Sequence, residues 1–481
     1  MSDLADLEPR PLWRYFLELS RIPRGSRNEA AAMRWVAEQG RALGCAVEQD
    51  AVGNVLLRKA AARGGEGRAP VALQVHADMV CEKNEGTPHD FERDGIDVVR
   101  DGEVVRARGT TLGADDGIGV AAALAALADP ELRHGPLEVL VTVDEETGLT
   151  GANAVRPGWL AAKVLLNLDS EEEGELTIGC AGGVDTVATR RVTRAAPAAG
   201  SVPLRVKVSG LRGGHSGTDI AAGRGNALRV LGQVLAALAA GGGCELASVR
   251  GGNKRNAIAR EASAVLQVAP GRAAAVREEV ARQEAAWRAA LGAFDPGLSV
   301  AVEPGSAGPV LSPADAQAVV GLLLAGPHGV EAMSPDIPGL VQTSTNFGVF
   351  ETRDDAVEAN FLTRSSVDAS KSALAARIAG VCALAGFETH TTGGYPGWKP
   401  EPGAPVVKLV DGVHRELFGK PMVVRAIHAG LECGLIGEKY PGLQMVSFGP
   451  TMWDAHTPDE RVSIASVQNF WRLLRAVLER V

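Results

Sequence analysis

The first 180 residues alternate short apolar runs with helical stretches, and this alternation constrains the fold more than any other feature. Residues 71–75 (VALQV), 137–143 (LEVLVTV) and 164–168 (VLLNL) have the length and apolar character of strands buried on both faces. An alanine-rich stretch, residues 117–128, has the composition of a helix and lies between the first two runs. Such alternation predicts an α/β sheet covered by helices on both faces.

A different pattern begins near residues 181–185. Residues 204–210 (LRVKVSG) alternate polar and apolar side chains, as expected of a half-exposed strand. The proline-rich segment 393–405 (GGYPGWKPEPGAP) has the composition of a linker. Since domains average about 100–200 residues, we expect a chain of 481 residues to contain two or three of them. Further helices are expected at residues 11–19, 28–43, 226–240, 273–290, 370–384, 406–417 and 464–478, and a further strand at 445–448.

The charge balance and the cysteines exclude several classes of protein. The chain carries 49 basic and 58 acidic side chains, a net charge of −9, which argues against nucleic acid or an anionic membrane as partner. The N-terminal segment MSDLADLEPR has no apolar run, so we expect no secretory signal, and no apolar stretch reaches the length of a membrane-spanning helix. Six cysteines without CxxC pairing suit reduced thiols. We therefore predict a cytoplasmic protein.

Acidic and histidine side chains follow the expected strands. His76 and Asp78 lie two residues apart, so their side chains share one face of an extended chain. Because ligands of open α/β sheets gather beyond the carboxyl ends of the strands, we expect the whole set to converge there. The other members are Asp115 and Asp116 in TTLGADDGIG, Asp144, Glu145 and Glu146 after residues 137–143, Asp169 in NLD, and His456 in DAHTPDE.

Converging carboxylates repel one another unless positive charge neutralises them. Two divalent cations would do so, and mixed imidazole and carboxylate ligands are typical of zinc or manganese. Any single acid here has an alternative interpretation as a helix cap or a solvated loop residue. The complete ordered set favours a metal site over that alternative.

These motifs resemble the M20 metallopeptidases, and within them the aminoacyl-histidine dipeptidase (peptidase D) branch, also called beta-alanyl-histidine or cytosol nonspecific dipeptidases. One departure is Ala77, where relatives commonly carry a larger apolar residue, and we expect it to alter packing alone. The matching segments are LQVHADMVCEKN (73–84), HDFERDGI (89–96), TTLGADDGIG (110–119), TVDEETGLTGA (142–152), NLDSEEEGELTIGCAGG (167–183), VSGLRGGHSG (208–217), RNAIAR (255–260), AIHAGLECG (426–434) and AHTPDER (455–461).

The resemblance implies an α/β catalytic domain of the di-metal-peptidase type, formed by residues 1–185 and 395–481. An inserted α+β lid or dimerisation domain would occupy residues 186–394. It further implies hydrolysis of Xaa-His and other unblocked dipeptides by a homodimer that pairs through the lid domain.

The resemblance also implies the roles of the acids and histidines. Two divalent ions per subunit are expected, zinc foremost, with manganese or cobalt as alternatives. Asp78 would orient His76, and Glu145 would take a proton from a water between the metals and pass it to the leaving amine. The implied metal ligands are His76, Asp115 as the bridge, Glu146, Asp169 and His456.

Four residues outside the metal set would bind substrate by the same resemblance. His215 in GGHSG would donate a hydrogen bond to the oxyanion in the partner subunit's site, with Asn256 beside it. Arg364 would bind the substrate α-carboxylate, and Gly430 would let the backbone approach the substrate. The alternatives are a structural or solvated histidine at His215 and an ordinary surface or interface ion pair at Arg364. His428 and Glu432 receive no role, and His89, His134, His328, His390 and His414 are expected on the surface.

Two other functions stay open from the sequence. One is an M20 amidohydrolase acting on N-acyl amino acids, and the other is a non-catalytic metal-binding protein of the same fold. Catalysis by Cys81 as nucleophile is disfavoured, because no histidine is free nearby to serve as its base.

Overall fold

The computed structural model describes Leu4, residues 6–62 and residues 64–481. We expect no targeting signal in the N-terminal segment, and the first residues of that segment lie outside the described residues. Contacts within the chain divide it into two compact units. Unit 1 comprises Met1–Gly179, Trp398–Ala426 and Leu431–Val481, and unit 2 comprises Cys180–Gly397 and Ile427–Gly430. Across the described residues, no helix combines the length and apolar character needed to cross a membrane.

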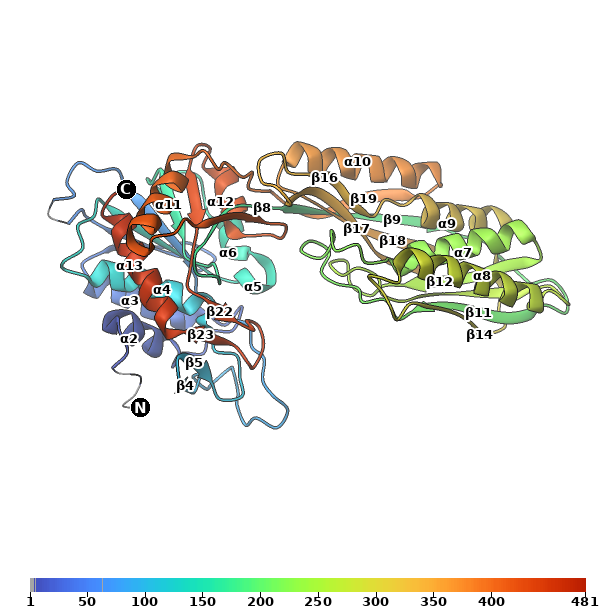
Figure 1. The fold of residues 1–481 in the computed structure, drawn as a ribbon, viewed down its shortest axis with the longest axis horizontal. Helices are drawn as coiled ribbons and strands as arrows, with labels where there is room; N and C mark the ends of the chain where they lie inside the picture. Colours follow the sequence, from blue (N-terminus) through green and yellow to red (C-terminus); the bar gives the residue numbers. More distant parts are fainter. Residues whose placement is uncertain (1–3, 5, 63) are drawn as a thin grey trace. The chain divides into compact units, whose positions relative to one another are not determined.

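Unit 1 is built on an eight-stranded sheet (Figure 1). The neighbours β6, β3, β7 and β21 run parallel. Every residue of β3 and β6 is buried, so the centre of the sheet is covered on both faces, as their continuous apolar runs predicted. The strand order is β1 (Ala46–Gln49), β2 (Val55–Lys59), β6 (Leu137–Thr142), β3 (Val71–His76), β7 (Val164–Asn167), β21 (Gln444–Ser447), β8 (Glu175–Cys180) and β20 (Val423–Ile427).

The longer helices of unit 1 lie close to their predicted positions, whereas the short ones at residues 145–148, 150–154 and 432–439 were not predicted. The central one, α4 (Ala114–Ala128), is buried around nearly its whole circumference, which its alanine-rich sequence permits because the small side chains allow close packing. It begins three residues earlier than expected, although Asp115 and Asp116 have non-helical backbone angles. The others are α2 (Arg10–Leu19), α3 (Ala30–Ala42), α5 (Glu145–Gly148), α6 (Thr150–Ala154), α11 (Pro405–Phe418), α12 (Glu432–Lys439) and α13 (Ile464–Leu478).

A four-stranded sheet in unit 1 joins distant parts of the chain. It has the order β22 (Met452–Trp453), β23 (Arg461–Ser463), β5 (Val104–Ala107) and β4 (Val98–Asp101). Because β22 and β23 flank the loop that carries His456, the pairing of β23 with β5 brings this loop to the segment that leads into α4.

Unit 2 is an α+β unit with a nine-stranded antiparallel sheet (Figure 1). Its helices share one hydrophobic core with the sheet. The helices are α7 (Ala227–Gly241), α8 (Ala273–Leu291), α9 (Pro313–Ala325) and α10 (Asp368–Leu384). The strands are β14 (Ser299–Pro304), β11 (Val202–Ser209), β13 (Ala262–Val268), β12 (Cys244–Gly251), β17 (Val341–Thr352), β18 (Ala356–Ser365), β9 (Gly182–Arg191) and β19 (Glu388–Tyr395), with β16 (Gly329–Met333) paired to β17.

The predicted fold class is confirmed, with one local correction. The expected linker at residues 393–405 was placed too early, because Tyr395 pairs with Gly183 of β9 at the end of β19. Pairing with a sheet edge satisfies backbone groups that a linker would leave to water, and it outweighs the turn preference of Gly393 and Gly394.

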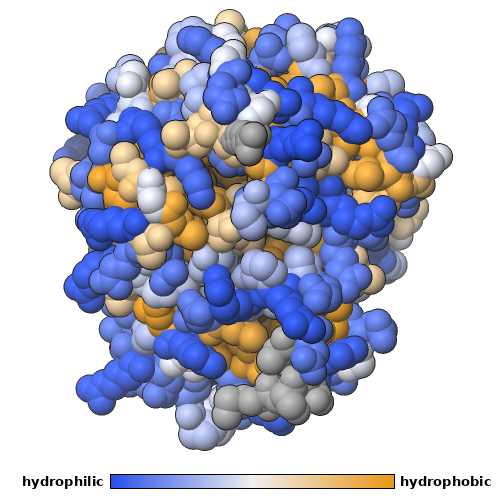
Figure 2. Space-filling view, turned by 90° about the vertical axis from the view of Figure 1, so that its left-hand side faces the viewer, coloured by the Kyte–Doolittle hydropathy of each residue, from blue (hydrophilic) through white to orange (hydrophobic). Residues whose placement is uncertain are grey.

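The surface of the molecule is mostly hydrophilic on the face that Figure 2 shows. The hydrophobic residues on this face form separate patches between the hydrophilic ones.

Candidate metal centre

The parallel strands of unit 1 place the predicted ligands at one edge of the sheet. His76 is the last residue of β3, Glu146 follows β6, and Asp169 follows β7. The loop with His456 comes after β21, the fourth parallel strand. The expected convergence beyond the carboxyl ends of the strands therefore occurs.

A first ligand group surrounds His76. Its Nε2 atom lies 3.2 Å from Oδ1 of Asp115 and 3.2 Å from Oδ1 of Asp169. The imidazole is 1% exposed. Burial opposes its protonation, but Asp169, Asp115 and Asp78 outweigh that effect and raise the pKa of His76 well above its usual value.

A second ligand group surrounds His456. Its Nε2 atom lies 3.2 Å from Oδ2 of Asp115 and 3.1 Å from Oε2 of Glu146. Asp115 thus offers one oxygen to each group, which is the arrangement of a bridging carboxylate. Hydrogen bonds to Asp115 and Glu146 raise the pKa of His456 to about 11, a measure of the negative charge concentrated here.

These donors fit two divalent ions. Ligands of a tetrahedral zinc, each about 2.0–2.1 Å from the ion, lie roughly 3.3 Å from one another, close to the spacing of both groups. The second oxygen of Glu146, Oε1, is buried and has no hydrogen-bond partner. A buried carboxylate oxygen without a donor is costly unless a cation satisfies it. The chain therefore has ligand groups for two metal ions.

Asp116 also lies within ligand distance of His76 and Asp169. Its two oxygens, however, accept hydrogen bonds from the backbone N–H groups of His76 and Gly119, each 3.1 Å long. Asp116 therefore supports the start of α4, and Asp115 remains the better ligand.

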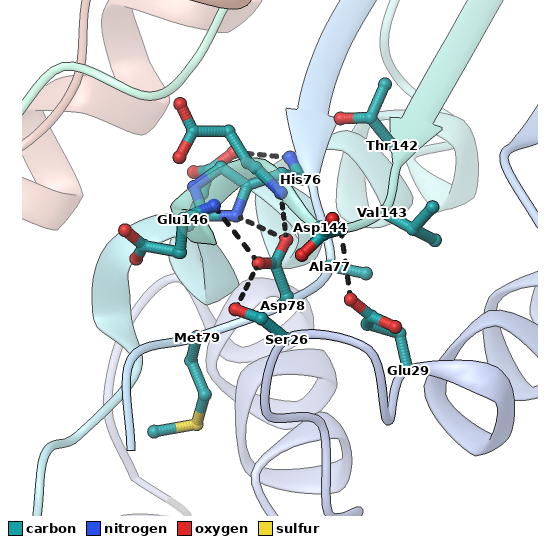
Figure 3. Close-up of polar contacts among 12 residues, drawn as sticks. Ser26, Glu29, His76, Ala77, Asp78, Met79, Thr142, Val143, Asp144 and Glu146 are labelled. Atoms are coloured by element: carbon teal, nitrogen blue, oxygen red, sulfur yellow. Dashed lines mark hydrogen bonds and ion pairs between the residues drawn. The ribbon is translucent and has the colours of Figure 1, made fainter. Parts of the chain in front are cut away.

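Asp78 lies beside His76 and connects it to the segment after β6 (Figure 3). Its Oδ1 is 3.4 Å from Nδ1 of His76, and its carboxylate accepts from the backbone N–H groups of Glu145 and Glu146 and from the Ser26 hydroxyl. Burial alone would raise the pKa of Asp78, but these donors and His76 lower it to about 2. Asp78 is therefore ionised and placed to hold the imidazole in orientation.

Glu145 and Glu432 are acids of the same region. Glu145 is half-buried, and the loss of water around its carboxyl raises the pKa of this group to about 8. Glu432, to which the sequence assigned no role, is 1% exposed at the start of α12, and burial raises the pKa of its carboxyl to about 7. It accepts hydrogen bonds from Gln74 (2.5 Å) and Thr142 (2.7 Å).

Arg364 and His215 contact each other in unit 2. Arg364 is 5% exposed and donates to the Tyr395 hydroxyl (2.9 Å) and the Ser216 hydroxyl (3.2 Å), while its Nη2 lies 3.4 Å from Nε2 of His215. Among the described residues no carboxylate forms an ion pair with it. Arg364 therefore forms no surface ion pair among the described residues of unit 2, although its charge acts on the carboxyl of Asp185.

Asn256 and Gly430 are the other predicted substrate residues. Asn256 and His215 line the same cavity of unit 2, about 770 Å³ in volume. At Gly430 an added Cβ atom would lie 3.0 Å from the ring of Tyr395. The missing side chain thus makes room for this tyrosine.

Two of the histidines expected on the surface are buried, so that expectation was wrong for them. His134 and His414 are 2% and 1% exposed. The Nδ1 atom of His134 lies within hydrogen-bonding distance of the carbonyl oxygen of Gly135, and that of His414 within the same distance of the carbonyl oxygen of Lys420. The residue type alone does not predict such partners.

Comparison with known proteins gives consistent matches. The sequence model described as peptidase family M20/M25/M40 matches residues 72–480. The chain is 42% identical to the cytosol non-specific dipeptidase of Escherichia coli (strain K12), over 100% of this chain and 99% of that protein. The crystal structure of aminoacylhistidine dipeptidase from Vibrio alginolyticus superposes with a TM-score of 0.94 at 41% identity, covering 100% and 99% of the two chains. A tripeptidase of Staphylococcus aureus, 16% identical with 98% of both chains covered, shares the fold with a TM-score of 0.58.

Proposed function

The chain belongs to peptidase family M20/M25/M40, as its motifs predicted, and from that premise we propose that this peptide hydrolase is a dinuclear metal-dependent dipeptidase. The observation that carries the proposal is the pair of ligand groups that share Asp115. The two dipeptidases that match over their whole length support the same substrate class, unblocked dipeptides including Xaa-His.

We assign His76, Asp115 and Asp169 to one ion and His456, Glu146 and Asp115 to the other, with zinc as the metal and manganese or cobalt as alternatives. When bound, two such ions polarise the scissile carbonyl and lower the pKa of the attacking water. Asp78 keeps the His76 ring in the orientation that presents Nε2 to this site.

Glu145 is the proton carrier of the proposal. Its backbone N–H donates a hydrogen bond to Asp78, which fixes its position. In sequence it comes shortly after β6, at the edge of the sheet where the ligands gather. It takes a proton from the attacking water and then gives it to the leaving amine.

The substrate residues of the proposal lie in unit 2. Arg364, which forms no ion pair among the described residues, suits the α-carboxylate of a dipeptide, which a guanidinium binds with two parallel hydrogen bonds. His215 donates to the developing oxyanion, with Asn256 as its neighbour. We place His215 in the site of the partner subunit of a homodimer that pairs through residues 186–394, while residues 1–185 and 395–481 form the catalytic domain. We place the enzyme in the cytoplasm, as the name of one relative says of that protein.

The test is hydrolysis of alanyl-histidine and carnosine beside N-acetylhistidine, before and after chelation and readdition of zinc. We expect zinc-dependent hydrolysis of the two unblocked dipeptides and little of the acetylated compound. Preference for N-acetylhistidine would instead identify an amidohydrolase, and no hydrolysis across a dipeptide panel would favour a metal-binding protein.

A further inference from the structure

Arg24 is a buried cation next to the metal centre that the proposed mechanism does not use. It is 1% exposed and lies between α2 and α3. Its Nη1 donates to the carbonyl oxygens of Ala77 (2.9 Å) and Asp78 (3.1 Å), and its Nη2 donates to that of Gly113. One guanidinium therefore holds the segment that follows His76 and the segment that precedes Asp115.

Glu460 is a buried acid that binds the segment preceding Asp115, the same segment whose carbonyl oxygen Arg24 contacts. It is 2% exposed, and its carboxylate accepts from the backbone N–H groups of Leu112 (2.7 Å), Gly113 (3.0 Å) and Ala114 (2.7 Å). It follows His456 by four residues, in the same loop. The carboxylate thus ties the loop of one metal ligand to the segment that carries another.

Gly113 is the point where both contacts meet. Its N–H donates to Glu460 and its carbonyl accepts from Arg24. Its φ of 68° lies in the left-handed region that favours glycine. An added Cβ atom would lie 2.5 Å from Nη2 of Arg24 and 2.7 Å from Sδ of Met79, so a side chain here would displace the guanidinium or the loop.

The surrounding charges explain how an arginine can be buried at this position. Glu460, Asp78, Asp116 and Asp115 all lie near enough to stabilise its positive charge. A buried charge is costly unless it is well paired, so its presence beside these acids requires compensation from them. Arg24 supplies a fixed positive charge where metal-free carboxylates would repel one another.

We propose that Arg24 and Glu460 are positioning residues that fix residues 112–114, so that the carboxylate of Asp115 is held between the two ligand groups. The proposal rests on the proposed function, since it concerns the metal centre of that enzyme. Loss of either contact leaves all five ligands in place but frees the backbone that orients Asp115. The first consequence is weaker metal binding, and slower catalysis follows from it.

The experiment is a zinc titration of the metal-free protein against a chromogenic chelator, with thermal unfolding of the same samples. Glu460→Gln keeps the size of the side chain but loses its charge and one of its acceptor oxygens. We expect it to weaken zinc binding about 10- to 100-fold, the range seen when residues that support metal ligands are removed. Arg24→Lys should act in the same direction, since an ammonium cannot span three carbonyl oxygens.

A matched control separates positioning from general stability. Asp315 in unit 2 is also a buried carboxylate that accepts from a backbone N–H and pairs with an arginine, Arg190. Asp315→Asn should lower the midpoint of thermal unfolding and leave zinc affinity unchanged. If Glu460→Gln behaves like this control, with lower stability and wild-type zinc affinity, the proposal is overturned. Because zinc binding needs no turnover, this outcome is distinct from a wild-type enzyme that fails to hydrolyse dipeptides.

Discussion

The hydroxyl of Tyr395 accepts a 2.9 Å hydrogen bond from Nη1 of Arg364. The tyrosine ring lies against two glycines, since an added Cβ atom would come within 2.6 Å of the ring at Gly183 and 3.0 Å at Gly430. Neutral side chains thus orient the guanidinium of Arg364, and Asp185 lies near enough to interact with its charge without forming an ion pair with it. In the proposed enzyme this guanidinium binds the substrate carboxylate.

Tyr395→Phe removes this hydrogen bond and little else. We expect KM for alanyl-histidine to rise roughly fivefold, corresponding to about 1 kcal/mol, with kcat nearly unchanged. The corresponding dipeptide amide lacks the carboxylate, so its kinetics should not respond. An equal effect on the dipeptide and its amide would show that Tyr395 acts elsewhere.

Gly430→Ala pushes the ring of Tyr395 out of its place. We expect a rise in KM at least as large as for Tyr395→Phe, because Arg364 loses both its partner and its packing. Gly412→Ala is the matched control, since that helical glycine has open space around it and should gain helix stability without a change in KM. An unchanged KM in Gly430→Ala would contradict the role of the glycine as space for Tyr395.

Glu145→Ala removes the proposed proton carrier without removing a metal ligand. We expect kcat to fall by at least about 100-fold, the usual contribution of a general base, while two zinc ions per chain are retained. Activity assays and metal analysis of one preparation check both parts. Retained turnover would exclude Glu145 as the base.

Removal of metal should destabilise unit 1. The carboxylates of Asp115, Glu146 and Asp169 then repel one another, and a ligand that binds only the folded state always adds stability. We expect chelation to lower Tm and zinc readdition to restore it. An unchanged Tm with demonstrated metal loss would mean that the ions contribute nothing to folding.

Asp315 makes stability depend on pH in unit 2. Burial alone would raise its pKa, but Ser312, Thr193 and Arg190 hold it well below the usual value of 3.8. A carboxyl whose pKa is lower in the folded state stabilises the protein above the unfolded pKa, and this stability is lost as the pH falls below about 4. The Tm difference between wild type and Asp315→Asn should therefore be full at pH 7 and smaller at pH 3. A difference that does not shrink would rule out the ionised carboxylate as its source.

The sequence predicted those parts of the fold that depend on local pattern. The run at 71–75 became β3 because a strand buried on both faces must be apolar throughout, and this also placed His76 at the edge of the sheet. The wider set of acids and histidines was recognisable because its members follow expected strands or precede an expected helix, whereas the choice of His76, Asp115, Glu146, Asp169 and His456 as ligands came from the family resemblance.

Contacts between distant segments could not be predicted in this way. Arg24 looks like any loop arginine in sequence, and only the packed structure brings its guanidinium to the carbonyls of Ala77 and Gly113. Tyr395 lies in a segment whose glycines and prolines indicate a linker, yet sheet pairing fixes it beside Arg364. The burial of Glu432 likewise depends on Gln74 and Thr142, which belong to two different strands.

The pairing of β23 with β5 has a consequence for the order in which the protein matures. His76, Asp115 and Asp169 leave the ribosome long before His456 and Glu460, which lie about 290 residues or more further along the sequence. The contact of Glu460 with residues 112–114 cannot form before residues 456–460 have been made and have folded against this segment. In the proposed enzyme, Asp115 can therefore bridge two ions only after β23 has paired with β5.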